Sequence, residues 1–293
     1  MDNIEELFED KCKLPKFIKY CIYILKKIFC VLTIKEEKNC ILPYKKIKNK
    51  TIVNLIIKII NKTTNNVVLS YYLNDLRELK SKMLENNIYI YDGKLLSNYL
   101  LYNFINYISN IKNEQVYTQE IFILVNNANS INESNIIYFA EHFKRINIVT
   151  NNINHFRKIE NYLEEKMGIG IVITNNKRKS LSKARIIINL DFDEETLNSF
   201  NLNTKAIIIS INNKINIKTK LFNGINICDY QIIYKNNFDS DIYKKFDKKL
   251  LYESTIIGKK YDYIINKIKE DDVKIVNLIG KNGIINYMEY KQN

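Results

Sequence analysis

The sequence predicts an α/β fold with a Rossmann-like, mainly parallel sheet. From Val67 onward, short β-rich runs alternate with amphipathic helical stretches, as in chains built from βα units. Five runs in the middle of the chain are continuous in Ile, Val and Leu, which is typical of parallel strands buried on both faces. With 46% apolar residues, only seven Gly and two Pro, the chain can bury a core. Wholesale disorder and collagen-like structure are therefore excluded.

Residues 1–62 differ from the rest of the chain in charge. The first ten residues carry five acids and no base, whereas residues 11–62 carry 14 Lys and only two Glu. Lys alternates with apolar residues between Lys11 and Phe29, so we expect a basic helical segment. Such a helix can lie on an anionic membrane surface or contact nucleic-acid phosphates. Its apolar positions nearly encircle the helix, which favours packing against the α/β body, and scarce Arg disfavours nucleic acid.

The same segment contains an apolar stretch, Phe17–Ile34, that is not expected to cross a membrane. Three Lys interrupt it, and a single spanning helix needs about 20 apolar residues. Acids precede the stretch and no small-residue cleavage site follows it, so a signal peptide is also a poor fit. We therefore expect a cytoplasmic protein.

The cysteines give no indication of a metal site. Their number is odd, they form no C-x-x-C pair, and the nine-residue spacings place the first three on alternating helix faces. We expect no bound metal and interpret them as small core or boundary residues. The five are Cys12, Cys21, Cys30, Cys40 and Cys228.

Residues 63–113 are predicted to form a small βα block. Its expected elements are a strand at Val67–Leu69, a helix at Asn74–Glu85, a strand at Ile88–Tyr91 and a helix at Leu95–Ile111.

Residues 114–235 are predicted to form the Rossmann-like domain. Helices are expected at Glu133–Phe143 and His155–Met167, and Gly224–Ile233 has an antiparallel-like pattern, as does the stretch from Ile215 to Lys218. The five expected parallel strands are 121–125, 146–149, 169–173, 186–190 and 206–210.

Residues 236–293 are predicted to form a C-terminal helical region. Helices are expected at Asp239–Ile256 and Tyr261–Glu270. In two-domain α/β enzymes such a tail often returns to pack on the first domain, and we expect the same here.

Within residues 121–191, Ile148–Asn152 at a strand end leads into a helix at Phe156–Glu160, and a later strand reads Ala184–Asn189. These motifs resemble the NAD(P)-binding domain of the shikimate dehydrogenase and glutamyl-tRNA reductase group. In that group an Asn-Arg-Thr-like turn and a helix follow the second strand, and Ile148–Asn152 followed by Phe156–Glu160 is similar. The group's fourth strand resembles Ala184–Asn189. The resemblance covers about a quarter of the chain. It implies NAD or NADP as cofactor and an oxidoreductase activity.

The turn after the first strand departs from that group, whose glycines let the backbone approach a diphosphate at a helix N-terminus. Here the turn contains no glycine from Asn126 to Ser130. Ser130 and Glu133 can form a capping box, which uses N–H groups that a phosphate needs and adds a repelling carboxylate. We therefore expect a degenerate nucleotide site.

Polar residues follow every expected parallel strand, at the edge where doubly wound sheets bind ligands. These neutral ends suit a hydroxyl-rich or amide ligand, although Asn is also a common turn former. Asp191 could accept a ribose or substrate hydroxyl. The basic run that begins at Lys177 and Arg178 could hold a phosphate or carboxylate, or form a solvated loop. The candidate ligand-binding residues are Asn126, Asn127, Ser130, Thr150, Asn151, Asn152, Thr174, Lys177, Arg178, Asn189 and Asp191.

The sequence thus predicts a non-catalytic or weakly catalytic Rossmann-like protein. It would bind a small metabolite, a nucleotide or a protein partner at the carboxyl edge of the sheet. One alternative is an NAD(P)-dependent oxidoreductase of the resembling group. Another is a protein that associates with a membrane surface or nucleic acid through residues 11–62. The two histidines, His142 and His155, fall on expected helices and are interpreted as helix-surface residues.

Overall fold

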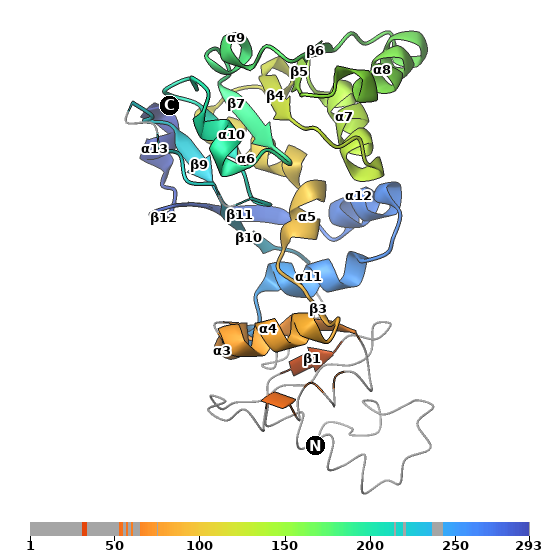
Figure 1. Ribbon diagram of the computed structural model, residues 1–293, viewed down its shortest axis with the longest axis vertical. Coiled ribbons are helices and arrows are strands. Elements are labelled where there is room, and N and C mark those ends of the chain that lie inside the picture. The colour runs from red at the N-terminus through yellow and green to blue at the C-terminus, as the bar shows by residue number, and fades with distance from the viewer. Residues whose placement is uncertain are drawn as a thin grey trace, which may run out of the picture. The chain divides into compact units, whose positions relative to one another are not determined.

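The chain divides into two compact units in the computed structural model (Figure 1). The first unit takes its described residues from 1–93 and 236–258, and the second from 94–235 and 259–293. The chain therefore returns to the first unit once before it ends in the second. The structure describes residues 31–33, 53, 54, 57, 60, 65–74, 76–213, 215–218, 221–235 and 243–292.

The first unit is built on a small three-stranded sheet. Its strands, in spatial order, are β1 (Val31–Thr33), β2 (Asn66–Leu69) and β3 (Tyr89–Ile90). The first pair is antiparallel and the second parallel. Its helices are α3 (Tyr71–Asn74), α4 (Arg77–Glu85) and α11 (Lys248–Ile256), with a 3₁₀ turn at Tyr243–Lys245.

Helix α11 shows the expected return of a C-terminal helix to the first unit. Leu250 and Leu251 of this helix are buried in one cluster with Val67–Leu69 of β2 and with Met83 of α4. The helix begins after Asp247, whose side chain caps it by accepting a backbone N–H bond. Such a cap is favourable because the first N–H groups of a helix lack partners within it.

Two expectations for the first unit differ from the structure. Val31–Thr33 lie in the segment expected to be helical, but they pair with β2 as a strand. The helix expected at Asn74–Glu85 is present as α4 but begins at Arg77, because Leu76 before it has extended backbone angles and Asn74 ends the separate helix α3. The basic stretch from Lys11 to Phe29 lies outside the described residues.

The second unit contains a six-stranded sheet in which every neighbouring pair is parallel. The spatial order is β6-β5-β4-β7-β8-β9, so the strands numbered along the chain run 3-2-1-4-5-6. This is the order of the Rossmann fold, and the predicted fold class is confirmed. The strands are β4 (Glu120–Leu124), β5 (Arg145–Val149), β6 (Val172–Thr174), β7 (Ile186–Asn189), β8 (Ile207–Ile209) and β9 (Ile225–Ile227).

The centre of this sheet is apolar on both faces. All four residues of β7 and all three residues of β8 are buried. Consecutive burial explains why these strands are continuous runs of isoleucine rather than alternating ones. Strand order reverses between β4 and β7, because the chain proceeds outward from β4 in one direction and then returns to continue in the other. That reversal is the place where doubly wound sheets open a ligand crevice.

Helices and turns connect the parallel strands. Figure 1 shows α7 and α8 beside β5 and β6, the strands that they contact. The helices that precede or join the strands are α5 (Lys94–Tyr99), α6 (Leu101–Lys112), α7 (Ser130–His142), α8 (Ile153–Tyr162), α9 (Lys177–Leu181) and α10 (Glu194–Asn198). A 3₁₀ turn at Val116–Thr118 leads into β4, and a π-helical turn at Leu163–Met167 ends α8.

The end of the second unit differs from the expected helical tail. Here Lys274–Gly280 forms β11, which pairs antiparallel with β10 (Asp229–Ile233) and with β12 (Gly283–Ile284). The antiparallel pattern expected from Gly224 to Ile233 is correct for β10 only, since β9 pairs parallel with β8. Ile215–Lys218 forms no strand. The helices here are α12 (Tyr261–Glu270) and α13 (Tyr287–Gln292).

We predict that Gly224→Ala destabilises the second unit. A Cβ atom at Gly224 would lie 2.1 Å from the backbone oxygen of Ala206, so the start of β9 would have to move away from β8. Such overpacking costs about 1–3 kcal/mol in the free energy of unfolding. Urea denaturation measures the loss. Gly170→Ala is the matched control, since nothing lies within 4 Å of its Cβ position. Equal midpoints for the two variants would contradict this account of the close approach.

We also predict that alkaline pH destabilises the first unit through Tyr91. Burial, and to a smaller extent Tyr89 and the Glu253 carboxylate, raise the pKa of Tyr91 to about 12. The unfolded chain ionises near pH 10, so this contribution to stability is complete below about pH 10 and disappears by about pH 12. Denaturation across that range should show a smaller loss in Tyr91→Phe than in the wild type. A Tyr117→Phe variant is the control, because Tyr117 is exposed.

Candidate functional site

The candidate site lies at the carboxyl ends of β4, β5 and β7, on either side of the strand-order reversal. Three loops meet there, starting after Leu124, Val149 and Asn189. In nucleotide-binding sheets of this order, the backbone N–H groups of the first loop face the diphosphate. The partners of those N–H groups in this chain therefore decide what the edge can bind.

The Asp191 carboxylate takes the N–H groups of the first loop. The backbone N–H of Asn126 donates to both carboxylate oxygens of Asp191, at 2.8 and 2.9 Å. The backbone N–H of Asn127 donates to Oδ2 at 2.7 Å. Bonds from a neutral donor to an ionised acceptor are stronger than neutral ones. An internal anion thus occupies the donors that an external phosphate would use.

The side chain of Asn126 extends this network to the loop after β5. Its Oδ1 accepts the backbone N–H of Asn151 at 2.8 Å and lies 3.4 Å from the hydroxyl oxygen of Thr150. Thr150 is fully buried, and its hydroxyl in turn accepts the N–H of Asn152 at 3.0 Å. One asparagine side chain therefore ties two strand ends together.

Lys177, the first residue of α9 after β6, contacts the same edge. Its ammonium donates to Oδ1 of Asn151 and lies 5.5 and 5.2 Å from the ring centroids of Phe192 and Phe200. Contact with two ring faces favours the cation where it lies. The next base, Arg178, is exposed on α9. Of the two basic residues proposed from sequence to hold an anion, only Lys177 contacts the network.

Asn189 has a structural role beside Asp191. It is buried, and its side chain accepts the N–H of Phe192 at 3.0 Å while donating to the carbonyl oxygen of Phe192 at 2.9 Å. It also donates to the Ser210 hydroxyl at 3.1 Å. These bonds fold the chain after β7 into a tight turn, which directs the Asp191 carboxylate back toward β4.

The start of α7 corrects the expected capping box. The N-cap is Asn129, whose Oδ1 accepts the N–H of Asn132 at 2.9 Å, and Ser130 is the exposed first residue of the helix. The N–H of Glu133 bonds the Asn129 carbonyl, so it does not bond Ser130. The expected loss of an N–H group that a phosphate would need remains, because the Asn129 side chain bonds an N–H group at this helix terminus.

The remaining predicted residues lie around the network. The hydroxyl of Thr174 accepts the N–H of Asn176 at 3.0 Å, and its carbonyl oxygen bonds the N–H of Thr150. The side chains of Asn127 and Asn152 are exposed and make no hydrogen bond within the described part of the chain. These two amides are therefore available to a ligand.

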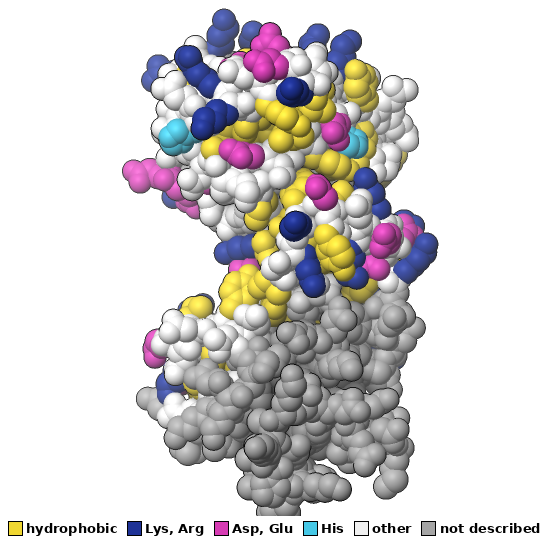
Figure 2. Space-filling view, turned by 90° about the vertical axis from the view of Figure 1, so that its right-hand side faces the viewer, with side chains coloured by type: hydrophobic (Ala, Val, Ile, Leu, Met, Phe, Trp, Pro, Cys, Tyr) yellow, Lys and Arg dark blue, Asp and Glu magenta, His cyan; other side chains and the backbone are white. Residues whose placement is uncertain are grey.

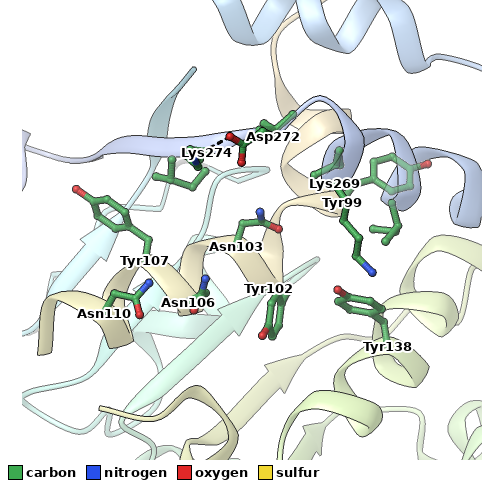
Figure 3. Close-up of a pocket in the computed structure, with 14 residues that line it drawn as sticks. Tyr99, Tyr102, Asn103, Asn106, Tyr107, Asn110, Tyr138, Lys269, Asp272 and Lys274 are labelled. Atoms are coloured by element: carbon green, nitrogen blue, oxygen red, sulfur yellow. Dashed lines mark hydrogen bonds and ion pairs between the residues drawn. The ribbon is translucent and has the colours of Figure 1, made fainter. Parts of the chain in front are cut away.

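A second hollow, which the sequence did not indicate, lies elsewhere in the second unit. It has a volume of about 530 Å³ and lies between α6, the N-terminal half of β11, α12 and the Tyr138 side chain of α7 (Figure 3). We call it the Tyr–Asn groove. Its polar and aromatic lining residues are Tyr99, Tyr102, Asn103, Asn106, Tyr107, Asn110, Tyr138, Lys269, Asp272 and Lys274.

The Tyr–Asn groove is asymmetric in charge. At one end the Lys269 ammonium lies 5.7 Å from the ring centroid of Tyr138 and forms no ion pair within the described residues. On the β11 side the Lys274 ammonium lies 2.7 Å from the Asp272 carboxylate, which also lies 3.6 Å from the Lys235 ammonium. The lone histidine nearby, His142, bonds the Tyr138 carbonyl through Nδ1 at 2.7 Å. His155 is exposed on the first turn of α8.

No protein-family model and no curated protein matches this sequence. Three solved structures are similar in fold, and the chain spans 37 to 63% of their lengths. Δ(1)-pyrroline-2-carboxylate reductase from Thermococcus litoralis, in complex with NADH and L-proline, is 12% identical with a TM-score of 0.27, over 41% of this chain and 37% of that one. L-tryptophan dehydrogenase from Nostoc punctiforme is 8% identical with a TM-score of 0.36, over 76% and 63%. A protein described as an aspartate carbamoyltransferase from Trypanosoma cruzi is 11% identical with a TM-score of 0.26, over 58% and 60%. At such scores the likeness carries no information on activity.

We predict that Asp191→Ala frees the first loop. Two backbone N–H groups lose their acceptor, so the free energy of unfolding should fall by about 2 kcal/mol. Amide hydrogen exchange at Asn126 and Asn127 should accelerate markedly, while exchange within β7 should not change. Asp193→Ala is the control, because this exposed N-cap of α10 accepts N–H bonds from its own helix only. Unchanged protection of the two loop amides in Asp191→Ala would contradict the assigned bonds.

Proposed function

We propose that this chain is a non-catalytic Rossmann-like protein that binds a small neutral ligand at the carboxyl edge of its parallel sheet. The observation that carries the proposal is the Asp191 carboxylate on the N–H groups of Asn126 and Asn127. It removes the diphosphate-binding feature of the fold while leaving a polar edge in place.

A diphosphate is disfavoured at this edge for electrostatic reasons. Two unit negative charges 4 Å apart near a protein surface repel by about 4 kcal/mol. A phosphate approaching the loop after β4 would meet the Asp191 carboxylate instead of free N–H donors. The Cβ atoms of the glycine-free turn also occupy space that a close approach requires.

Neutral hydroxyl and amide groups suit the same edge. A carboxylate has about four lone-pair sites, so Asp191 can still accept a ligand hydroxyl beside its three N–H bonds. The exposed carboxamides of Asn127 and Asn152 each offer two donors and one acceptor. We therefore propose a polyhydroxylated or amide-bearing small molecule, such as a nucleoside or a sugar without phosphate.

Two other functions remain as alternatives. An NAD(P)-dependent oxidoreductase of the shikimate dehydrogenase and glutamyl-tRNA reductase group would have to displace Asp191 from the first loop. Association with a membrane surface or nucleic acid would act through residues 11–62, most of which lie outside the described residues. On the face shown in Figure 2, basic and acidic side chains are interspersed. Among the described helices, none is both long and apolar enough to cross a bilayer.

A thermal-shift screen of the full chain tests the proposal. We expect adenosine, uridine and simple monosaccharides to include a stabilising ligand, whereas NAD, NADP and their reduced forms should give no shift at millimolar concentration. A ligand at 100 times its dissociation constant stabilises by about 2.7 kcal/mol, which such a screen detects. Asn127→Ala should weaken the response, because it removes an amide and leaves the backbone bond to Asp191. Asn201→Ala, another exposed asparagine, is the matched control.

A thermal shift with the nicotinamide cofactors and none with nucleosides or sugars would contradict the proposal. A cofactor shift that Asn127→Glu abolishes would instead support the oxidoreductase alternative. Salt-sensitive binding to anionic vesicles or oligonucleotides that disappears on removal of residues 1–62 would support association with a membrane surface or nucleic acid. No thermal shift with any nucleoside or sugar would exclude both classes as the neutral ligand.

A further inference from the structure

The Tyr–Asn groove is a hollow in the second unit that is separate from the carboxyl edge of the sheet. We propose that it binds the C-terminal segment of a peptide in an extended conformation. Its volume of about 530 Å³ lies within the range of pockets that hold drug-sized ligands. The proposal does not depend on what the carboxyl edge binds.

Three carboxamides form a row along one face of α6. Asn103, Asn106 and Asn110 are three and four residues apart, a spacing that places them on one face of a helix. None of their side chains has a hydrogen-bond partner within the described part of the chain. Figure 3 shows all three on the side of α6 that borders the groove. Amides that find no partner in the protein are free to bond a ligand.

The row matches the chemistry and the repeat of a peptide backbone. A carboxamide carries both donors and an acceptor, as a peptide group does. At 1.5 Å per helical residue, Asn103 and Asn110 are separated by about 10 Å along α6. An extended chain covers about 10 Å in three residues. Three amides therefore correspond to about three peptide groups.

The opposite wall of the groove contains an irregular strand. Asn277 and Ile275 of β11 pair with Gln231 and Ile232, so Val276 between them is the extra residue of a β-bulge. The Val276 carbonyl accepts the hydroxyl of Tyr107 at 2.9 Å. That bond ties Tyr107 of α6 to β11 beside the groove, and bulges are over-represented next to active sites.

The charge of the groove selects a carboxylate at one end. Lys269 forms no ion pair within the described residues, whereas Lys274 shares the Asp272 carboxylate with Lys235. A peptide C-terminus carries one negative charge, which complements one ammonium. The rings of Tyr99 and Tyr138 lie at the Lys269 end, where they can contact the last side chain (Figure 3). A nucleic-acid strand would require several Lys or Arg side chains without ion-pair partners along the groove. The charges that line the groove therefore disfavour a nucleic acid.

Fluorescence anisotropy of the full chain with two labelled pentapeptide pools tests the site. The pools have the same randomised sequences, one with free carboxyl ends and one with amidated ends. We expect the free-carboxylate pool to bind more tightly. Lys269→Gln and Asn106→Ala should each weaken that binding about tenfold, the loss expected for one hydrogen bond to a charged group or a well-placed amide. Asn127→Ala at the carboxyl edge should have no effect.

Matched variants on another helix separate binding from folding. Lys158→Gln and Asn161→Ala replace exposed residues of α8 and should leave binding unchanged. Circular dichroism and the thermal midpoint should be the same for all four variants. Equal affinity for both pools, indifference to Lys269→Gln, or no binding at millimolar peptide would each overturn the proposal. So would tighter binding of a labelled oligothymidine that competes with the peptides.

Discussion

The bonds from the Asn126 and Asn127 backbone to the Asp191 carboxylate hold the carboxyl edge of the parallel sheet together. They join the loop after β4 to the loop after β7, across the point where strand order reverses. Asn126 then joins the loop after β5, and Lys177 of α9 bonds the same loop through Asn151. Because each loop supplies partners for the next, the backbone N–H groups of Asn126, Asn127 and Asn151 are bonded by side chains of the protein.

The centre of the parallel sheet could be predicted because its strands are buried on both faces, whereas the exposed edge strand expected at 169–173 begins only at Val172. Strands buried on both faces are apolar along most of their length, and the isoleucine runs of β7 and β8 follow from that burial. The antiparallel part could not be predicted as well. Whether Ile225–Ile227 pairs in parallel, or whether Lys274–Gly280 is a strand at all, depends on partners far along the chain. Local pattern carries no information about those partners.

The two candidate sites show the same division between local and distant information. Asp191 could be singled out because it follows a buried strand without an evident capping role. Its donors lie 64 and 65 residues away, so the sequence could suggest an acceptor but could not say that the protein itself supplies the donors. The Tyr–Asn groove requires α6, α7, α12 and β11 to meet. The spacing of Asn103, Asn106 and Asn110 marks one helix face, yet nothing local indicates that this face borders a hollow.

The Asp191 carboxylate stabilises the first loop as part of the chain itself. A protein that relies on a bound cofactor gains stability in proportion to the logarithm of the free cofactor concentration. Asp191 is tethered to the same chain, so its effective concentration at the loop is fixed. The stabilisation that the Asp191 bonds give the first loop therefore does not vary with the concentration of any solute.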